Sequence, residues 1–319
     1  MVYAVETRNL VKNYNGFTAL DGISFNIEQG DIVGYVGPNG AGKTTTIKIL
    51  TTLLKPTSGH VYINGADVTK RSREIFYDIG ALIEVPGIYD YLTPAEMLSY
   101  FGKIYRMPIN EIEKQTKETL GLLKLSDWEH KKIGTFSTGM QRRLAIAKAI
   151  FHRPKILILD EPVLGLDPEG IRDVRELIKK FNSEGVTIFL SSHLLGEVAA
   201  VCKKVIFIDK GRITDYDSID NISTKNISKA IDVKFLKPLS KEELIELEKI
   251  ELIKSINANN ESVLIGFDGK QGTSSQILKR IVSLGYEIAS FNVESIELED
   301  YYLSIMSEEK GGRIDDINS

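Results

Sequence analysis

The 319-residue sequence predicts an α/β core followed by a smaller α+β domain. Three observations predict this arrangement. A glycine-rich stretch over residues 37–44 joins a buried strand pattern to a helix pattern, and an apolar run over residues 155–159 ends in two carboxylates. Beyond residue 217, strand and helix patterns follow one another in the order βαββαβ. At roughly 150 residues per domain, the length also favours about two domains.

Composition and charge exclude several classes of protein. Charged residues make up 26% and hydrophobic residues 42% of the chain, as in ordinary globular proteins. The single cysteine, Cys202, cannot form an internal disulfide, and the sequence shows neither a signal-peptide pattern nor an apolar stretch of ~20 residues. We therefore expect a cytoplasmic protein that is held at the inner face of the cell membrane through a partner.

A phosphate-binding loop lies between the first buried strand and the first helix. Residues 31–36 have a strand pattern, residues 37–44 read GPNGAGKT, and a helix pattern follows over residues 45–53. The glycines allow successive backbone N–H groups and the helix N-terminus to face a polyphosphate. In such a loop Lys43 reaches the β- and γ-phosphates and Thr44 ligates Mg²⁺.

Capping patterns predict two helices after this core motif. Thr93, Pro94 and Glu96 form a capping box with proline in the first turn. Asn110, followed by an acidic first turn, is expected to be the N-cap of a second helix that ends near Gly121.

An apolar strand over residues 155–159 ends in Asp160 and Glu161. Its C-terminal end is expected beside the phosphate loop, as in parallel sheets that bind ligands. Asp160 would then hold Mg²⁺ directly or through water, and Glu161 would orient or deprotonate the attacking water. Paired acids elsewhere are usually solvated, but at the end of an apolar strand they are costly to bury without a cation.

A third motif lies between the phosphate loop and this strand, where residues 136–147 read FSTGMQRRLAIA. Ser137 has the features of an N-cap and Gly139 permits close backbone approach, so that the helix presents its positive end to phosphate. With this motif, residues 3–216 resemble the ATP-binding subunits of ABC transporters. The resemblance implies a P-loop NTPase core over residues 1–216, a helical subdomain at about 87–150, and ATP and Mg²⁺ as cofactors.

The resemblance also implies functional residues at the matching positions. Those expected to act in catalysis are Lys43, Glu161, which handles the water, and His193, which senses the γ-phosphate. The expected Mg²⁺ ligands are Thr44, Asp160 and Glu84. The residues expected to contact nucleotide are Tyr14, Gly37, Pro38, Asn39, Gly40, Ala41, Gly42, Lys43, Thr44, Thr45, Glu84, Ser137, Gly139 and Asp167.

Two positions depart from the family's usual pattern. The third motif reads FSTGM instead of the common LSGGQ, and Glu84 stands where the family usually has Gln. Because an ionised Glu cannot donate a hydrogen bond and adds negative charge near phosphate, we expect altered coupling between nucleotide and the membrane partner. These departures resemble the bacitracin-export and lantibiotic-immunity branch of the family.

Two protein partners are implied by the same resemblance: a second ATP-binding subunit, in a homo- or heterodimer, and a separate integral membrane permease. Six apolar or aromatic residues could line the groove that receives the permease, although we expect at least half of them to be core residues. They are Ile88, Tyr89, Tyr91, Tyr100, Phe101 and Tyr105. No nucleic-acid partner is expected.

The C-terminal region, residues 217–319, has 12 Lys and Arg against 19 Asp and Glu. This acidic balance argues against a surface for nucleic acid or anionic lipid in that region. The expected strands are 230–236, 252–258, 262–267 and 287–293, with helices at 241–249, 275–284 and 297–303. This order suggests a ferredoxin-like accessory domain that regulates the ATPase or docks a subunit, and a passive stabilising module is the alternative.

The leading hypothesis is an ATPase that powers export of peptide antibiotics or other amphiphilic substrates. One alternative is a non-transport ATPase of the same class that acts on ribosomes or DNA. The sequence disfavours it, because it contains neither a second ATPase unit nor a long coiled-coil insertion. A nucleotide-dependent sensor is the other alternative, and steady-state turnover would separate it from the ATPase.

Overall fold

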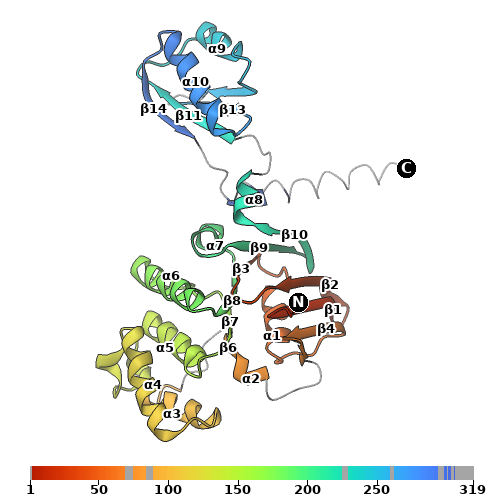
Figure 1. Cartoon of the computed structure of the whole chain (residues 1–319), viewed down its shortest axis with the longest axis vertical. Coiled ribbons are helices and arrows are strands. Elements are labelled where there is room, and N and C mark those ends of the chain that lie inside the picture. The colour runs from red at the N-terminus through yellow and green to blue at the C-terminus, as the bar shows by residue number, and fades with distance from the viewer. Residues whose placement is uncertain are drawn as a thin grey trace. The chain divides into compact units, whose positions relative to one another are not determined.

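The computed structural model describes residues 2–68, 75–83, 89–224, 229–258, 262–293, 298–299, 301–302 and 305. The chain divides into two compact units, residues 1–218 and 219–319 (Figure 1). Glu84, Ile88 and part of the helix expected at 297–303 lie outside the described residues. No helix in the described part is both long and apolar enough to cross a membrane.

The first unit is built around a mixed sheet whose strand order is β10-β9-β3-β8-β7-β6 within the described residues. Neighbouring strands from β9 to β6 run parallel, whereas β10 is antiparallel to β9. The strands are β3 (Ile32–Val36), β6 (Ile79–Leu82), β7 (Ile156–Asp160), β8 (Thr187–Ser192), β9 (Lys204–Asp209) and β10 (Arg212–Ser218).

A second, antiparallel sheet of the first unit has the order β2-β1-β4-β5 among the residues described. Figure 1 shows α1 and this sheet on one side of the parallel strands, with α5, α6 and α7 on the other. Its strands are β1 (Val5–Tyr14), β2 (Phe17–Ile27), β4 (Ser58–Ile63) and β5 (Ala66–Asp67). The helices are α1 (Lys43–Leu50), α2 (Ile75–Asp78), α5 (Thr138–Ile150), α6 (Pro168–Ser183) and α7 (Leu195–Val201).

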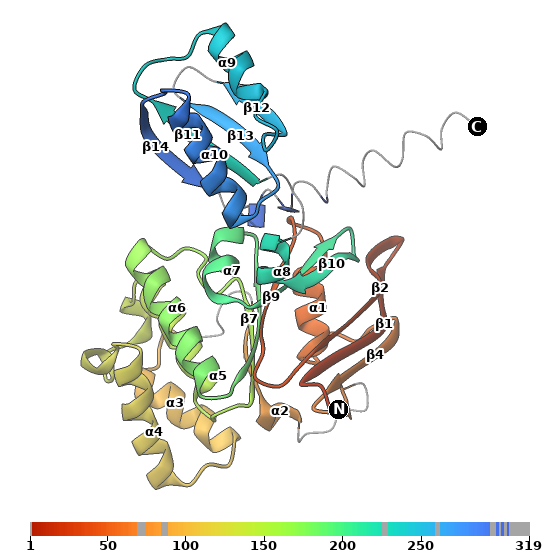
Figure 2. The same cartoon turned by 45° about the horizontal axis from the view of Figure 1, so that its top comes forward.

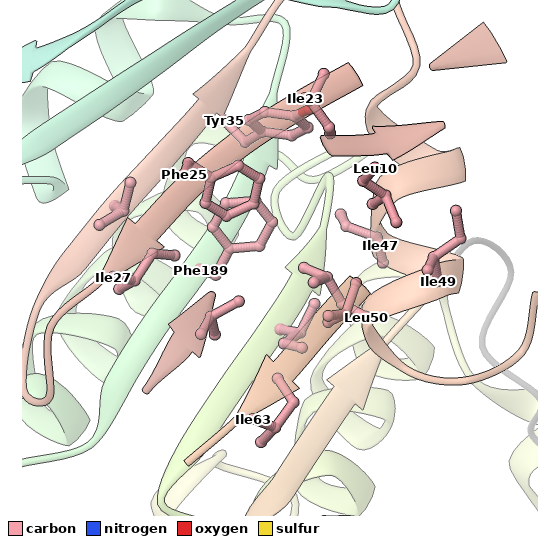
Figure 3. Close-up of a cluster of buried hydrophobic side chains, with 14 of the residues drawn as sticks. Leu10, Ile23, Phe25, Ile27, Tyr35, Ile47, Ile49, Leu50, Ile63 and Phe189 are labelled. Carbon is pink, nitrogen blue, oxygen red and sulfur yellow. The ribbon is translucent and has the colours of Figure 1, made fainter. Parts of the chain in front are cut away.

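The main core of this unit lies between the two sheets and α1 (Figure 3). Phe25, Tyr35 and Phe189 come from β2, β3 and β8 and form an aromatic cluster with ring centroids 5.1 to 6.0 Å apart. The Tyr35 hydroxyl is 3.1 Å from Thr46 Oγ1 on α1, and burial raises the pKa of Tyr35. This contact joins the strand before the phosphate loop to the helix after it.

Two further helices, α3 (Pro94–Ile104) and α4 (Ile109–Leu122), pack beside α5 (Figure 2). The capping box predicted at Thr93 is confirmed, because Thr93 Oγ1 accepts from the Glu96 N–H and Glu96 accepts from the Thr93 N–H. The N-cap predicted at Asn110 is wrong. Pro108 occupies that position, since its carbonyl accepts from the N–H groups of Glu111 and Ile112, and Asn110 therefore lies inside the first turn.

The second unit contains an antiparallel sheet with the order β12-β13-β11-β14 among its described residues. Alternate residues of β11 and β13, such as Ile231 and Ile265, pack with Leu247 and Ile277 in one buried cluster. Both longer helices therefore cover the same face of the sheet. The elements are α8 (Ile219–Thr224), β11 (Lys229–Phe235), α9 (Lys241–Glu248), β12 (Ser255–Ala258), β13 (Val263–Phe267), α10 (Gln271–Ser283) and β14 (Ile288–Val293).

Candidate functional site

The glycine-rich loop after β3 is shaped by close contact with neighbouring backbone. A Cβ on Gly37 would lie 2.1 Å from the Ile208 carbonyl oxygen, and a Cβ on Gly42 would lie 2.8 Å from the Ala19 carbonyl oxygen. Gly42 also has a φ of 111°, which favours glycine. Gly40 has a φ of 82° but open space where its Cβ would point. The loop is therefore closed on the protein side and open at Gly40.

Lys43 is a buried cation at the first position of α1. Its Nζ donates to the carbonyl oxygens of Gly37 at 2.6 Å and Pro38 at 3.2 Å, and lies 4.0 Å from Glu161 Oε1. Burial lowers the pKa of Lys43, while the carboxylates of Glu161 and Asp160 act in the opposite direction. The loop carbonyls and carboxylates thus hold the ammonium group inside the curve of the glycine loop.

Asp160, at the end of β7, is the buried acceptor of the site. Its Oδ2 accepts from Thr44 Oγ1 at 3.0 Å and its Oδ1 accepts from Ser191 Oγ at 2.5 Å. A hydroxyl and a carboxylate side by side fit Mg²⁺, which takes a few protein oxygens and completes its shell with water and phosphate. The described residues contain no cluster of three or more His, Cys, Asp or Glu, so they offer this open donor set and no closed metal cage.

Glu161 and His193 face each other across the ends of β7 and β8. His193 Nδ1 is 2.9 Å from Glu161 Oε2, and the Glu161 side chain is 18% exposed. The Glu161 backbone has a φ of 47°, and its N–H donates to Ser191 Oγ at 3.1 Å. A left-handed conformation at a non-glycine residue costs about 1–3 kcal/mol, so surrounding contacts must hold it in place.

Two residues that sequence reasoning missed complete this network. Ser191 joins the Asp160 carboxylate to the Glu161 backbone N–H, and Arg142 on α5 donates to the carbonyl oxygens of Asp160, Glu161 and Pro162. The sequence held one signal for Arg142: it lies three positions before Ala145 on the buried stripe of α5, where a cation requires partners.

The remaining predicted residues of the first unit lie on three separate elements. Ser137 is the N-cap of α5, and Asp167 is the N-cap of α6 with Pro168 at the first helical position, as predicted. In the described part of the chain, no hydrogen bond or ion pair connects Ser137, Gly139 or Asp167 to the phosphate loop. Tyr14 is 43% exposed at the end of β1, with Lys12 Nζ 4.9 Å from its ring centroid.

The helical region carries an exposed aromatic patch, which we define as Tyr89, Tyr91 and Tyr100. Tyr89 lies 5.8 Å from Tyr91 and 6.4 Å from Tyr100, measured between ring centroids. Tyr105 instead stacks on His152 at 3.8 Å, so it packs against the core.

Comparison with known proteins gives the family. A family model described as "ABC transporter" matches residues 20–164. The ABC transporter ATP-binding protein YcbN of Bacillus subtilis is 35% identical over 312 residues, covering 96% of this chain and 98% of YcbN. The chain is an ABC transporter ATP-binding protein. A second relative of this ABC protein, the bacitracin transport ATP-binding protein BcrA of Bacillus licheniformis, is 34% identical over 97% of this chain and 98% of BcrA.

Solved structures agree with this family. An ATP-binding cassette, MJ0796, in a dimeric post-hydrolysis state bound to ADP and Pi, is 28% identical with a TM-score of 0.63 and covers 67% of this chain and 98% of that one. The ATP-binding subunit of another ABC transporter has a TM-score of 0.64 at 29% identity, covering 69% of this chain and 91% of that subunit. This ABC protein is therefore an ATPase that uses ATP with Mg²⁺ and powers a separate permease.

Proposed function

We propose that this ATPase powers the export of peptide antibiotics or other amphiphilic substrates. The observation that carries the proposal is the match to BcrA, a bacitracin transport protein, over 97% of this chain, because it includes the second unit as well as the ATPase unit. The lantibiotic transport ATP-binding protein SrtF of Streptococcus pyogenes supports it, at 37% identity over 68% of this chain and 93% of SrtF.

For the chemistry, we assign complementary roles to three charged or titratable residues. The Lys43 ammonium neutralises charge on the β- and γ-phosphates, and the Glu161 carboxylate orients the attacking water and accepts its proton. His193, held against Glu161 Oε2, donates to the γ-phosphate through its other ring nitrogen. The 4.0 Å separation of Lys43 Nζ and Glu161 Oε1 places both groups around one reacting centre.

Thr44 and Asp160 would hold Mg²⁺, which supplies charge neutralisation at the phosphates when bound. The role of Glu84 as a further ligand rests on its place in the sequence. The rest of the nucleotide contacts the loop from Gly37 to Thr45, and the exposed ring of Tyr14 stacks on the base.

A second ATP-binding subunit completes the site in this proposal. The exposed Ser137 and the neighbouring Gly139 contact the ATP held by the partner subunit, and Asp167 lies at the same interface. Two features support this: these residues make no contact with their own phosphate loop, and a Cβ on Gly139 would meet nothing closer than 3.5 Å.

The membrane partner binds the aromatic patch of Tyr89, Tyr91 and Tyr100. Exposed aromatic rings are the usual anchors of protein interfaces. The protein then lies at the cytoplasmic face of the membrane through its permease.

The C-terminal region, residues 217–319, is proposed to be a ferredoxin-like accessory domain. Its antiparallel order β12-β13-β11-β14 with two helices on one face supports this description. Regulation or subunit docking is the role proposed for it, with residues 1–216 as the ATPase domain and about 87–150 as its helical subdomain.

The direct test of the ATPase site is Glu161→Gln. Hydrolysis is expected to slow by roughly 10²- to 10⁴-fold and MgATP to trap a dimer, because the water loses its base while both nucleotide surfaces remain. Steady-state turnover and size-exclusion chromatography with light scattering measure the two effects. Glu184→Gln is the control on an exposed glutamate of the same unit. A variant that hydrolyses at the wild-type rate and stays monomeric contradicts the assignment.

The substrate class needs a separate experiment. The chain is purified with its permease, and uptake of labelled bacitracin into inside-out vesicles is measured with ATP. ATP-driven uptake that Glu161→Gln abolishes supports peptide export. If the wild-type protein hydrolyses ATP but moves no bacitracin or lantibiotic, the substrate class is wrong and the ATPase assignment stands.

A further inference from the structure

Arg142 is a buried cation that contacts the backbone of the acidic strand's end. It lies on α5, and its side chain is among the buried charged groups of the first unit at 9% exposure. Its Nε donates to the Pro162 carbonyl oxygen at 3.1 Å, and its Nη2 donates to the carbonyl oxygens of Asp160 at 3.1 Å and Glu161. One guanidinium therefore holds three consecutive peptide carbonyls.

The backbone held in this way is that of the glutamate at the reacting centre. Glu161 has a φ of 47°, and its two peptide groups are fixed from opposite sides. Its N–H donates to Ser191 Oγ on β8, and its C=O accepts from Arg142 on α5. These contacts set the direction in which the Glu161 side chain leaves the backbone, toward His193 Nδ1 and Lys43 Nζ.

A buried guanidinium is an expensive way to fill space in a helix interface. Desolvation of a charge disfavours it, and an apolar side chain of similar volume packs without that penalty. The arginine fork, however, supplies several N–H donors in a fixed plane, which a single ammonium or an apolar group cannot do. The chemistry of Arg142 thus matches a need to fix several carbonyls at once.

We propose that Arg142 is a positioning residue for ATP hydrolysis, which holds the Glu161 backbone so that its carboxylate meets the attacking water. The inference rests on the proposed role of Glu161. It also links that glutamate to the tip of α5, because Arg142 lies about one helical turn from Ser137 and Thr138. Movement of this helix tip on contact with the partner subunit's nucleotide therefore shifts the glutamate of its own subunit.

The test compares Arg142→Gln with Arg142→Lys in the full-length protein. Displacement of a reacting group by a fraction of an ångström slows chemistry without removing ground-state contacts, so kcat for MgATP should fall about 10- to 100-fold in Arg142→Gln. The dissociation constant of a fluorescent ATP analogue should stay within about 2-fold, since Arg142 touches none of the phosphate-loop residues. Arg142→Lys should recover part of the rate, because it restores one donor and the charge.

A double-mutant cycle separates positioning from general destabilisation. In the Glu161→Gln background the carboxylate that Arg142 positions is gone, so adding Arg142→Gln should change the single-turnover rate by less than about 2-fold. A merely structural role would multiply the two losses. Lys148→Gln removes a half-buried charge from the same helix, away from residues 160–162, and should leave kcat unchanged.

Each outcome bears on a different statement. If wild-type protein does not hydrolyse MgATP, both the proposed function and this inference fail. If it does, and Arg142→Gln retains the wild-type kcat or the two losses multiply, the positioning role alone is wrong. If Arg142→Gln does not fold by circular dichroism, Arg142→Lys carries the test: unchanged kcat at unchanged nucleotide affinity overturns the role.

Discussion

The two units of this protein bury different kinds of side chain. In the first unit, polar groups converge where parallel strands end: Lys43, Asp160 and Ser191 are each at most 7% exposed. In the second, the buried cluster of described residues is apolar, as with Ile231 and Ile265. Burial of polar groups is costly without compensation, so it persists where the groups act together. The comparison teaches where chemistry lies: the first unit reacts, and the second contributes a folded surface.

Removal of the phosphate-loop ammonium should give the largest effect and would break this comparison if it did not. Lys43→Ala is expected to lower kcat by at least about 10²- to 10³-fold, because a preorganised donor to the developing phosphate charge is lost. Steady-state phosphate release measures it. Lys270→Ala in the second unit, where the lysine is 82% exposed, is the matched control and should stay at the wild-type rate. Equal losses in the two variants would show that the second unit takes part in the chemistry.

Sequence predicted the reacting centre because the motifs carry their own context. The phosphate loop and Asp160 are far apart in the chain, yet a glycine loop after one parallel strand and a carboxylate after another must meet at one sheet edge. The strand order β3-β8-β7 brings Thr44 within 3.0 Å of Asp160. Local patterns also predicted the cap at Thr93, since both reciprocal bonds form within four residues.

The rest depended on packing that local pattern does not encode. Arg142 and Ser191 act through backbone groups 18 to 31 residues away, and neither has a motif of its own. At Asn110 a favourable capping residue was outcompeted because the Pro108 carbonyl already begins the helix. The strand expected from residue 252 begins only at Ser255, because the Ile253 N–H turns back to the Ile250 carbonyl. Tertiary hydrogen bonds decided each case.

Matched cavities in the two cores would sharpen the comparison. Ile265→Ala in the second unit and Ile158→Ala in the first each remove a fully buried side chain and should cost about 2–5 kcal/mol of unfolding free energy. Calorimetry should show two transitions, with each substitution lowering only its own. ATPase activity at 20 °C should remain within about 2-fold for Ile265→Ala, since that unit holds none of the reacting groups. A single transition that both variants lower together would mean that the units unfold as one.

Acid should destabilise the two units unequally, by the smallest of these effects. All four histidines lie in the first unit, and burial lowers the pKa of His152 from 6.5 to about 4 while its Nε2 lies 3.0 Å from the Ile79 carbonyl oxygen. Between these pKa values the unfolded chain binds a proton that the folded chain does not. The free energy of unfolding must therefore fall as pH drops from 6.5 toward 4 and level off below it.

At pH 5 this loss reaches up to about 2 kcal/mol relative to pH 7.5. His152→Phe keeps a ring stacked on Tyr105 but cannot titrate, so its first-unit transition should lose less stability over the same range. Urea unfolding at pH 7.5 and 5 measures the difference, and the second-unit transition serves as the internal reference. If wild type and His152→Phe lose equal stability in the first unit, the acid sensitivity comes from groups shared by both, and buried His152 does not distinguish the units.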